Sequence, residues 1–381
     1  MFQINKNLKL LPAIFLFLVS FFMFTSCNKE FDKAGGEITF PPNGTTPTLA
    51  TLLDASDMTI LKAAVTKAGL LPSLSNTSLR FTLFAPNDAA MTSSGISLAV
   101  INALSVSTVT SLMQYHVVPQ VVSTASIPTT FPNLQYPTLL NPAPALSALL
   151  RLTTFPSRRA NGIWVNNIPI TVPDIQAVNG VMHKVALVVS PPSRYVYDRI
   201  NTDADLSIFK AAIIRADEGL APTSPTSIIG VMNNIGANLT VYAPSNQAFK
   251  NLISALTMGM IPTNAPDATY ISFLASNNVT TQTVRGIVVY HITLSRAFTN
   301  NIPITALSIP TFLNLGIPSH PGITIASTFT GPSVSAATVK GVANATASNI
   351  AINPTPDPAG TSDQHFLNGV IHKIDQVLLP Q

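Results

Sequence analysis

The fold of this chain is decided by a segment that occurs twice, as Asn179-Gly180-Val181-Met182-His183-Lys184 and as Asn368-Gly369-Val370-Ile371-His372-Lys373. In both copies Asn-Gly, a dipeptide typical of tight turns, stands between apolar runs. The residues that follow it alternate in the manner of a β-strand. Each half of the chain is therefore predicted to close with a turn and a strand.

Three further blocks repeat in the same order. Asp57–Val65 matches Asp205–Ile213, Thr82–Asn87 matches Thr240–Ser245, and Tyr115-His116 matches Tyr290-His291. The offset between the copies grows from 148 residues in the first of these blocks to 189 in the closing segment. Self-similarity in a fixed order is the mark of a repeated structural unit. The chain is interpreted as a tandem duplication whose second copy carries longer loops.

Each copy is predicted to open with helices. Asp57 and Asp205 are expected to be N-caps, because an aspartate side chain can accept a free amide of the first helical turn. Apolar residues behind them recur at helical spacing, and Gly69 is expected to end the helix of the first copy. A second helical face ends at His116 in the first copy and at His291 in the second. Helices therefore make up the first part of each copy.

Strands are predicted between and after these helices. The β-rich runs Phe81–Phe84 and Leu239–Tyr242 stop at Ala-Pro. Because proline donates no amide, Pro86 and Pro244 are expected to end these strands and redirect the chain. Asn87 and Ser245, which follow directly, are suited to cap the next helix. The predicted fold class is α+β.

Both copies resemble the fasciclin domain. The resemblance rests on three features: the aromatic-Ala-Pro block, the Tyr-His pair, and the closing Asn-Gly-Val-x-His segment. It covers about residues 47–190 and 194–381. It implies two tandem domains, each a wedge of β-strands with packed helices, and a role in adhesion rather than catalysis. The motif residues that carry it are Pro86, Asn179, Gly180, His183, Pro244, Asn368, Gly369 and His372.

In animal members of that family, the Tyr-His region has been linked to receptor binding. The resemblance therefore makes Tyr115, His116, Tyr290 and His291 the candidate interaction residues. The residues themselves favour a structural role for the histidines, which end apolar helical faces, whereas the two tyrosines are expected to be partly exposed.

The remaining histidines are expected to be structural or to lie in loops. His183 and His372 stand on apolar strands and are expected to be core residues bonded to the backbone. His320 and His365 have no counterpart in the first copy and are interpreted as loop residues. Because no cluster has the spacing of metal ligands, and no glycine-rich phosphate loop occurs, neither a metal nor a cofactor is predicted.

The N-terminus is interpreted as an export signal. Lys6 and Lys9 precede an apolar run over residues 10–24, which is too short to span a bilayer. Phe24-Thr25-Ser26-Cys27 resembles the lipobox of bacterial lipoproteins, and Cys27 is the only cysteine. Residues 1–26 are thus predicted to be a signal peptide, Cys27 the lipidation site, and residues 27–46 a flexible tether. The acyl chains would hold the protein on the outer membrane, on its periplasmic side or at the cell surface.

Composition narrows the range of partners. Charged residues make up 9% of the chain, against about 25% in ordinary globular proteins. The net charge is only +4. Nucleic acid is therefore excluded as a partner, because tracking phosphates needs clustered Lys and Arg.

The leading hypothesis is a non-enzymatic adhesion lipoprotein with an unknown protein or polysaccharide ligand. Two alternatives stay open. One is a glycan-capture accessory lipoprotein of an outer-membrane uptake system, which would use exposed aromatic residues such as Trp164. The other is a hydrolase, which requires an exposed nucleophile beside a histidine. Residues 128–148, rich in Pro and Leu, are a candidate insertion loop for partner contacts.

Overall fold

The computed structural model describes residues 46–381, which belong to one compact unit that spans residues 40–381. The predicted signal peptide, the lipidation site Cys27 and nearly all of the predicted tether lie outside the described residues. Among residues 46–381, no helix has both the length and the apolar character needed to cross a bilayer.

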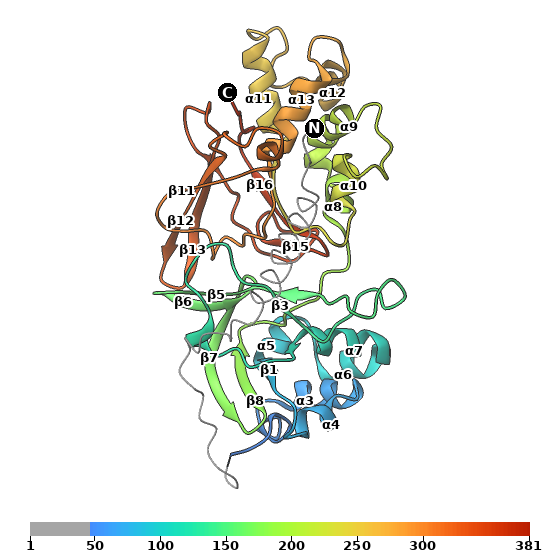
Figure 1. Cartoon of the computed structure of the whole chain (residues 1–381), viewed down its shortest axis with the longest axis vertical. Coiled ribbons are helices and arrows are strands. Elements are labelled where there is room, and N and C mark those ends of the chain that lie inside the picture. The colour runs from blue at the N-terminus through green and yellow to red at the C-terminus, as the bar shows by residue number, and fades with distance from the viewer. Residues whose placement is uncertain (1–45) are drawn as a thin grey trace, which may run out of the picture. The chain divides into compact units, whose positions relative to one another are not determined.

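The first repeat places six helices around a six-stranded sheet (Figure 1). Its strands lie in the order β2-β1-β8-β7-β6-β5, and only one pair, β1 and β8, is parallel. The helices are α2 (Leu49–Leu52), α3 (Thr59–Lys67), α4 (Leu71–Ser75), α5 (Asp88–Ser93), α6 (Leu98–Ala103) and α7 (Val106–Tyr115). The strands of the sheet are β1 (Phe81–Pro86), β2 (Val117–Val118), β5 (Pro156–Arg159), β6 (Gly162–Val165), β7 (Ile168–Ala177) and β8 (Gly180–Val185).

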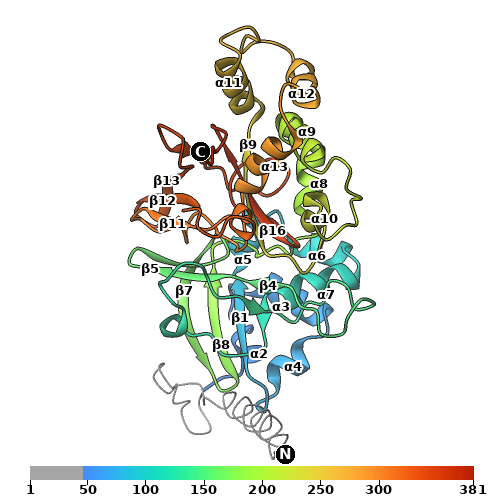
Figure 2. The same cartoon turned by 45° about the horizontal axis from the view of Figure 1, so that its top comes forward.

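The second repeat has the same number of strands as the first but divides them between two four-stranded sheets (Figure 2). Its main sheet has the order β10-β9-β16-β15, again with one parallel pair, β9 and β16. The helices are α8 (Val196–Thr202), α9 (Ser207–Ala216), α10 (Ile228–Met232), α11 (Asn246–Leu256), α12 (Asp267–Ala275) and α13 (Thr281–Tyr290). The main strands are β9 (Leu239–Pro244), β10 (Ile292–Thr293), β15 (Gln364–Phe366) and β16 (Gly369–Ile374). The strands of the other sheet are β11 (Leu307–Ile309), β12 (Ile323–Thr330), β13 (Ser333–Lys340) and β14 (Ser348–Asn349).

The two repeats agree in register as well as in order. Phe84 lies opposite His183 in the first repeat, and Tyr242 lies opposite His372 in the second. These are equivalent pairs of the two copies. The predicted duplication is therefore confirmed at the level of single residue pairs.

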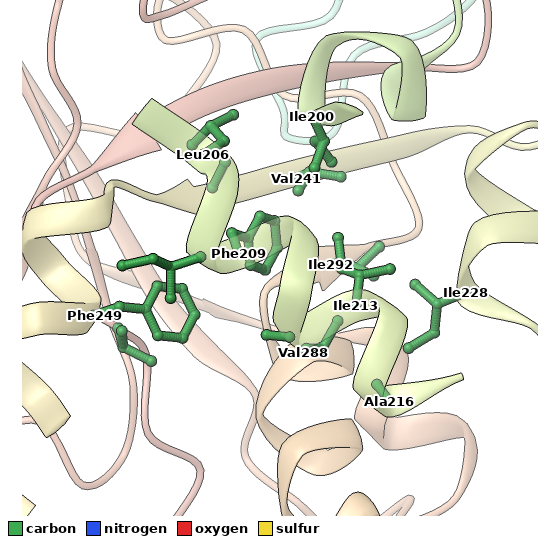
Figure 3. Packing of buried hydrophobic residues seen from close by; sticks show 14 of the residues in the cluster. Ile200, Leu206, Phe209, Ile213, Ala216, Ile228, Val241, Phe249, Val288 and Ile292 are labelled. Atoms are coloured by element: carbon green, nitrogen blue, oxygen red, sulfur yellow. The ribbon is translucent and has the colours of Figure 1, made fainter. Parts of the chain in front are cut away.

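A helical layer covers each sheet and buries the apolar faces predicted from helical spacing. In the second repeat, Phe209 and Ile213 of α9 pack with Phe249 of α11, Val288 of α13 and Val241 of β9 (Figure 3). The rings of Phe209 and Phe249 lie 6.2 Å apart. Burial of such side chains is the main source of folding free energy. It also fixes the end of α13, where the Tyr-His pair lies.

Helix capping follows the sequence in one place and departs from it in another. Asn87 and Ser245 cap α5 and α11, as predicted. The prediction that Asp57 and Asp205 are N-caps is wrong, since the residues before α3 and α9 are Met58 and Leu206. The reason is that the two aspartates form salt bridges with lysines of the central strands instead, at 2.7 Å and 3.2 Å.

The first turns of α3 and α9 are capped by side chains from helices further along the chain. The Ile60 amide donates to Asp88 Oδ1 at 2.8 Å, and the Ile208 amide donates to Asn246 Oδ1 at 3.0 Å. The free amides of a helix end need such an acceptor. Each of these two helices is therefore capped by a tertiary contact in place of a local N-cap side chain.

Residues 128–148 pack onto the first repeat over part of their length. Tyr136 of the short strand β3 (Tyr136–Pro137) is buried and pairs with Thr154 of β4 (Thr153–Thr154). Leu140 is also buried, whereas Leu146 is 69% exposed. The role of this segment in partner contacts stays a prediction.

The repeats contact each other through aromatic and polar side chains. Phe155 and Phe298 have ring centroids 5.8 Å apart, and the Trp164 ring lies 6.0 Å from Phe329. The Asn300 side chain donates to the Asn166 carbonyl at 2.8 Å. The two copies are thus joined by packed side chains as well as by the chain itself.

Candidate functional site

The four candidate interaction residues all lie in the interior. Tyr115, His116, Tyr290 and His291 have no exposed surface. The expectation that the two tyrosines are partly exposed is therefore wrong. The physical reason is that each tyrosine ends its helix against the sheet, where its ring fills the core and its hydroxyl finds a backbone partner.

His116 and His291 connect the end of a helix to the closing segment of the same repeat. In His116, Nδ1 donates to the Leu112 carbonyl at 2.8 Å and Nε2 accepts from the Val189 amide at 3.0 Å. In His291, the same atoms bond the Ile287 carbonyl at 2.8 Å and the Leu378 amide at 2.8 Å. Because an amide can only donate, Nε2 must carry the lone pair. Both imidazoles are thus neutral in the folded protein.

Burial accounts for the proton affinity of these two rings. Desolvation lowers the pKa of His116 to about 4 and that of His291 to about 4, and the bond to the helix carbonyl only partly offsets it. Neither ring nitrogen has a lone pair or a proton free for a substrate. These histidines are not equipped for acid–base catalysis.

His183 and His372 form the equivalent pair on the central strands. The Nε2 of His183 donates to the Val122 carbonyl at 2.8 Å, and its Nδ1 accepts from the Asp174 amide at 3.1 Å. His372 makes the same bonds with the Ala297 carbonyl and the Asp363 amide. Burial lowers the pKa of both rings. The prediction that they are core histidines bonded to backbone is confirmed.

The tyrosine hydroxyls are also bonded. The Tyr115 hydroxyl donates to the Thr153 carbonyl at 3.0 Å, and burial raises its pKa to about 12. The Tyr290 hydroxyl donates to the Gly322 carbonyl at 2.5 Å and accepts from the Val342 amide at 3.1 Å. Each Tyr-His pair therefore fastens the end of one helix to distant segments of its repeat.

Asn179 and Asn368 fasten the closing turn to the start of each repeat. Asn179 Oδ1 accepts from the Leu49 amide at 2.9 Å, and its Nδ2 donates to the Leu74 carbonyl at 2.7 Å. In the second repeat, Asn368 Oδ1 accepts from the Val196 amide at 3.1 Å and Nδ2 donates to the Met232 carbonyl at 2.8 Å. The asparagine of the motif is thus a buried connector rather than only a turn residue.

The glycine after Asn179 is required by a close approach of two strands. Gly180 has φ +152°, and a Cβ placed on it would lie 1.9 Å from the Phe81 carbonyl oxygen. No side chain fits in that space. This explains why glycine follows asparagine in the motif of the first repeat.

His365 differs from the predicted loop residue, because it lies in strand β15 where the repeats meet. Its Nε2 accepts from Arg296 Nη1 at 2.7 Å, and its ring contacts Phe155 and Phe298 at centroid distances of 6.0 Å and 5.4 Å. Burial lowers the pKa of His365 well below its ordinary value, and the positive charge of Arg296 lowers it further. The Arg296 guanidinium lies 5.1 Å from the centre of the Phe155 ring.

No sequence signal points to this junction, because its members are far apart along the chain and belong to no repeated block. His320, the other histidine without a counterpart, lies in a loop, as predicted.

The structure removes the features on which the two alternative functions, glycan capture and hydrolysis, depended. Trp164 is only 3% exposed, so the expectation of an exposed tryptophan for glycan stacking is wrong. The ring is covered by the contact with Phe329. Every aromatic side chain of residues 46–381 is buried or half-buried. The hydrolase hypothesis required an exposed nucleophile beside a histidine, and the four histidines of the repeated blocks, His116, His183, His291 and His372, are all fully buried. Residues 46–381 hold no group of three or more side chains arranged to bind a metal ion.

The family profile described as the Fasciclin domain matches two stretches of the chain, residues 56–191 and residues 225–380. This chain belongs to the fasciclin domain family. The matched stretches make up more than half of its length and contain both Tyr-His pairs and both closing segments. The expected α+β fold of two tandem fasciclin domains is confirmed.

Among known proteins, the chain is similar to the transforming growth factor-beta-induced protein ig-h3 of Sus scrofa. The two are 26% identical over 230 residues, which is 56% of this chain and 30% of that relative. The chain thus spans less than a third of that relative's length. A solved FAS1 domain pair from the insect cell adhesion molecule Fasciclin I matches 84% of this chain and 96% of its own, with 14% identity and a TM-score of 0.34. None of these matches indicates an enzyme family.

Proposed function

We propose that this protein is a membrane-anchored, non-enzymatic adhesion lipoprotein whose two fasciclin domains bind a protein or polysaccharide outside the cytoplasm. The observation that carries the proposal is the match of two stretches of the chain to the fasciclin domain, a family whose resemblance implies a role in adhesion. The lipobox-like sequence before Cys27 supports attachment to the outer membrane through acyl chains.

The interior of the domains supports a binding role rather than a catalytic one. In the imidazoles of the repeated motifs, both ring nitrogens are hydrogen-bonded to backbone groups, as in His116 and His183. A general base needs a free lone pair within reach of a substrate proton. Since these rings are also fully buried, the described domains offer surfaces and not a catalytic histidine.

Because the Tyr-His pairs are buried, we expect them to affect ligand binding only through the stability of the fold. A substitution at His116 or His291 should weaken adhesion only in proportion to the folded protein that is lost. A ligand must instead recognise surface side chains, and in this charge-poor chain most of those are neutral. Two domains on one anchor can raise the effective affinity if both engage.

The proposal is tested in cells that lack the gene. A deletion strain should adhere and form biofilm less well than its parent, and the full chain should restore both. The Cys27→Ala variant should fold but carry no acyl chains, and mass spectrometry of the wild-type N-terminus should find acyl chains on Cys27. Normal adhesion by the deletion strain would refute the adhesion role, and an unmodified Cys27 would refute the anchor.

A further inference from the structure

The connection between α11 and α12 presents the most exposed apolar side chain of the described residues. Met258 is 94% exposed, Met260 is 82% exposed and Leu256 is 67% exposed. Figure 2 shows this connection at the outer end of its two helices, at the top of the view. We refer to Leu256, Met258 and Met260 as the apolar tip. Single exposed apolar residues are common, but three within five consecutive residues concentrate exposed apolar surface at the end of α11.

The apolar tip is held in a defined shape by hydrogen bonds below it. The Gly259 amide donates to the Ser254 carbonyl at 2.8 Å, and the Met260 amide donates to the Thr257 carbonyl at 3.0 Å. Thr257 itself is buried, and its hydroxyl donates to the Ile253 carbonyl at 2.9 Å. The connection is therefore an ordered turn that presents its apolar side chains outward.

The backbone of this turn adopts an unfavourable conformation at one of these exposed side chains. Met258 has φ +49°, in the left-handed region that non-glycine residues rarely adopt. Such a conformation is costly, and packing does not compensate for it here because the side chain contacts almost nothing. A partner that covers Met258 would supply the missing contacts.

The tip is electrically neutral. No charged residue occurs between Lys250 and Asp267, and these two form a salt bridge with a distance of 2.7 Å at the base of the connection. Insertion of the tip into an apolar medium therefore requires no unpaired charge to leave water. This property suits the interfacial region of a bilayer and does not depend on anionic lipid.

The size of the tip also favours lipid over a protein partner. Three aliphatic side chains offer an apolar area of about a few hundred Å² at most. A specific protein interface buries about 800 Å² on each partner. A bilayer needs no complementary shape, and each inserted apolar side chain adds to its binding.

The duplication supplies an internal comparison. In the first repeat, the equivalent connection between α5 and α6 is Ser94-Gly95-Ile96-Ser97, and Ile96 is half-buried. The fold therefore does not require an apolar tip at this position. The longer, neutral connection is a property of the second repeat alone.

We propose that the apolar tip is a membrane-docking site that inserts Leu256, Met258 and Met260 into the interfacial region of a lipid bilayer. The site is independent of Cys27, so it can be tested without the acyl chains. It would give the protein a second contact with a membrane, either its own or that of a neighbouring cell.

The test is flotation of residues 28–381, which retain the whole compact unit, with vesicles of pure phosphatidylcholine. Wild type should float with the vesicles, and the extent should not change when salt is raised to about 0.5 M, because no charge drives binding. Met258→Asp together with Met260→Asp should weaken partitioning by roughly a hundredfold or more. Met258→Leu with Met260→Leu should bind like wild type, because apolar character and not the sulfur is required.

A matched control comes from the first repeat. Leu146 and Leu149 are 69% and 88% exposed, so Leu146→Asp with Leu149→Asp removes a comparable apolar area elsewhere. This variant should float like wild type, and circular dichroism should show that all variants are folded. The proposal is overturned if wild type fails to bind neutral vesicles or binds only anionic ones. It is also overturned if the Leu146→Asp, Leu149→Asp control loses binding as much as the Met258→Asp, Met260→Asp variant does. Self-association that depends on Met258, without any binding to vesicles, would also overturn it and assign the tip to a second copy of this chain.

Discussion

Acid should begin to destabilise this protein at pH values above the range in which carboxylates titrate, because the folded protein buries neutral histidines. The pKa of His116 is about 4 in the folded protein, against an ordinary value of 6.5 that the unfolded chain regains, and the same holds for His291. The unfolded chain therefore binds more protons between these two pH values. Stability contributed by each ring is complete above about pH 6.5 and is lost as the pH falls toward 4.

The magnitude follows from the two pKa values. One unit of pKa is worth about 1.4 kcal/mol, so each of these two histidines should lower the free energy of unfolding by about 2 kcal/mol between about pH 7 and pH 5. His183 and His372 also have lowered pKa values and add to the effect in the same direction. Paired carboxylates such as Asp57, whose pKa lies below 3.8, lose their contribution only at lower pH.

The assay is urea denaturation at a series of pH values, followed by circular dichroism and by the fluorescence of Trp164, which is the only tryptophan. The double variant His116→Gln and His291→Gln should be less stable near neutral pH, but its stability should fall less steeply on acidification, because glutamine takes up no proton. Asn179→Ala is the control, since it removes buried hydrogen bonds without removing a titrating group. The reasoning is refuted if wild-type stability is constant across this acid range, or if the histidine variant keeps the wild-type slope.

Three further predictions concern single contacts. Asn179→Ala should lower the free energy of unfolding by about 2–5 kcal/mol, because it leaves backbone groups at the start of α2 and at the end of α4 unpaired; a loss below about 1 kcal/mol in denaturation would contradict the connector role. Tyr290→Phe should cost about 1–3 kcal/mol through the two bonds of its buried hydroxyl, and an unchanged midpoint would show that those bonds are not formed. Phe155→Ala should cost about 3–5 kcal/mol and loosen the junction around Arg296, so that the repeats melt in separate calorimetric transitions; wild-type melting would argue against a packed junction.

The duplication, the α+β class and the position of the central strands could all be predicted from the order and spacing of the residues. These features are local: apolar spacing, the Ala-Pro block and the Asn-Gly turn each act over a few residues. The sequence also identified His183 and His372 as core residues, because their strand neighbours are apolar. Asn87 and Ser245 could be assigned as caps, since a cap and its helix are adjacent in the chain.

The long-range partners could not be predicted, because they come from segments that only folding brings together. Asp57 pairs with Lys184, 127 residues away, and so Asp88 supplies the cap that Asp57 was expected to form. Tyr115 has an ordinary helical neighbourhood in the sequence, and its burial depends on the strand and loop that the fold brings over it. The exposure of Met258 could not be predicted from the sequence either, because most apolar residues of this chain are buried. The burial or exposure of these particular residues and their pairing depend on what distant parts of the chain place around each side chain, and the spacing of neighbouring residues does not reveal that.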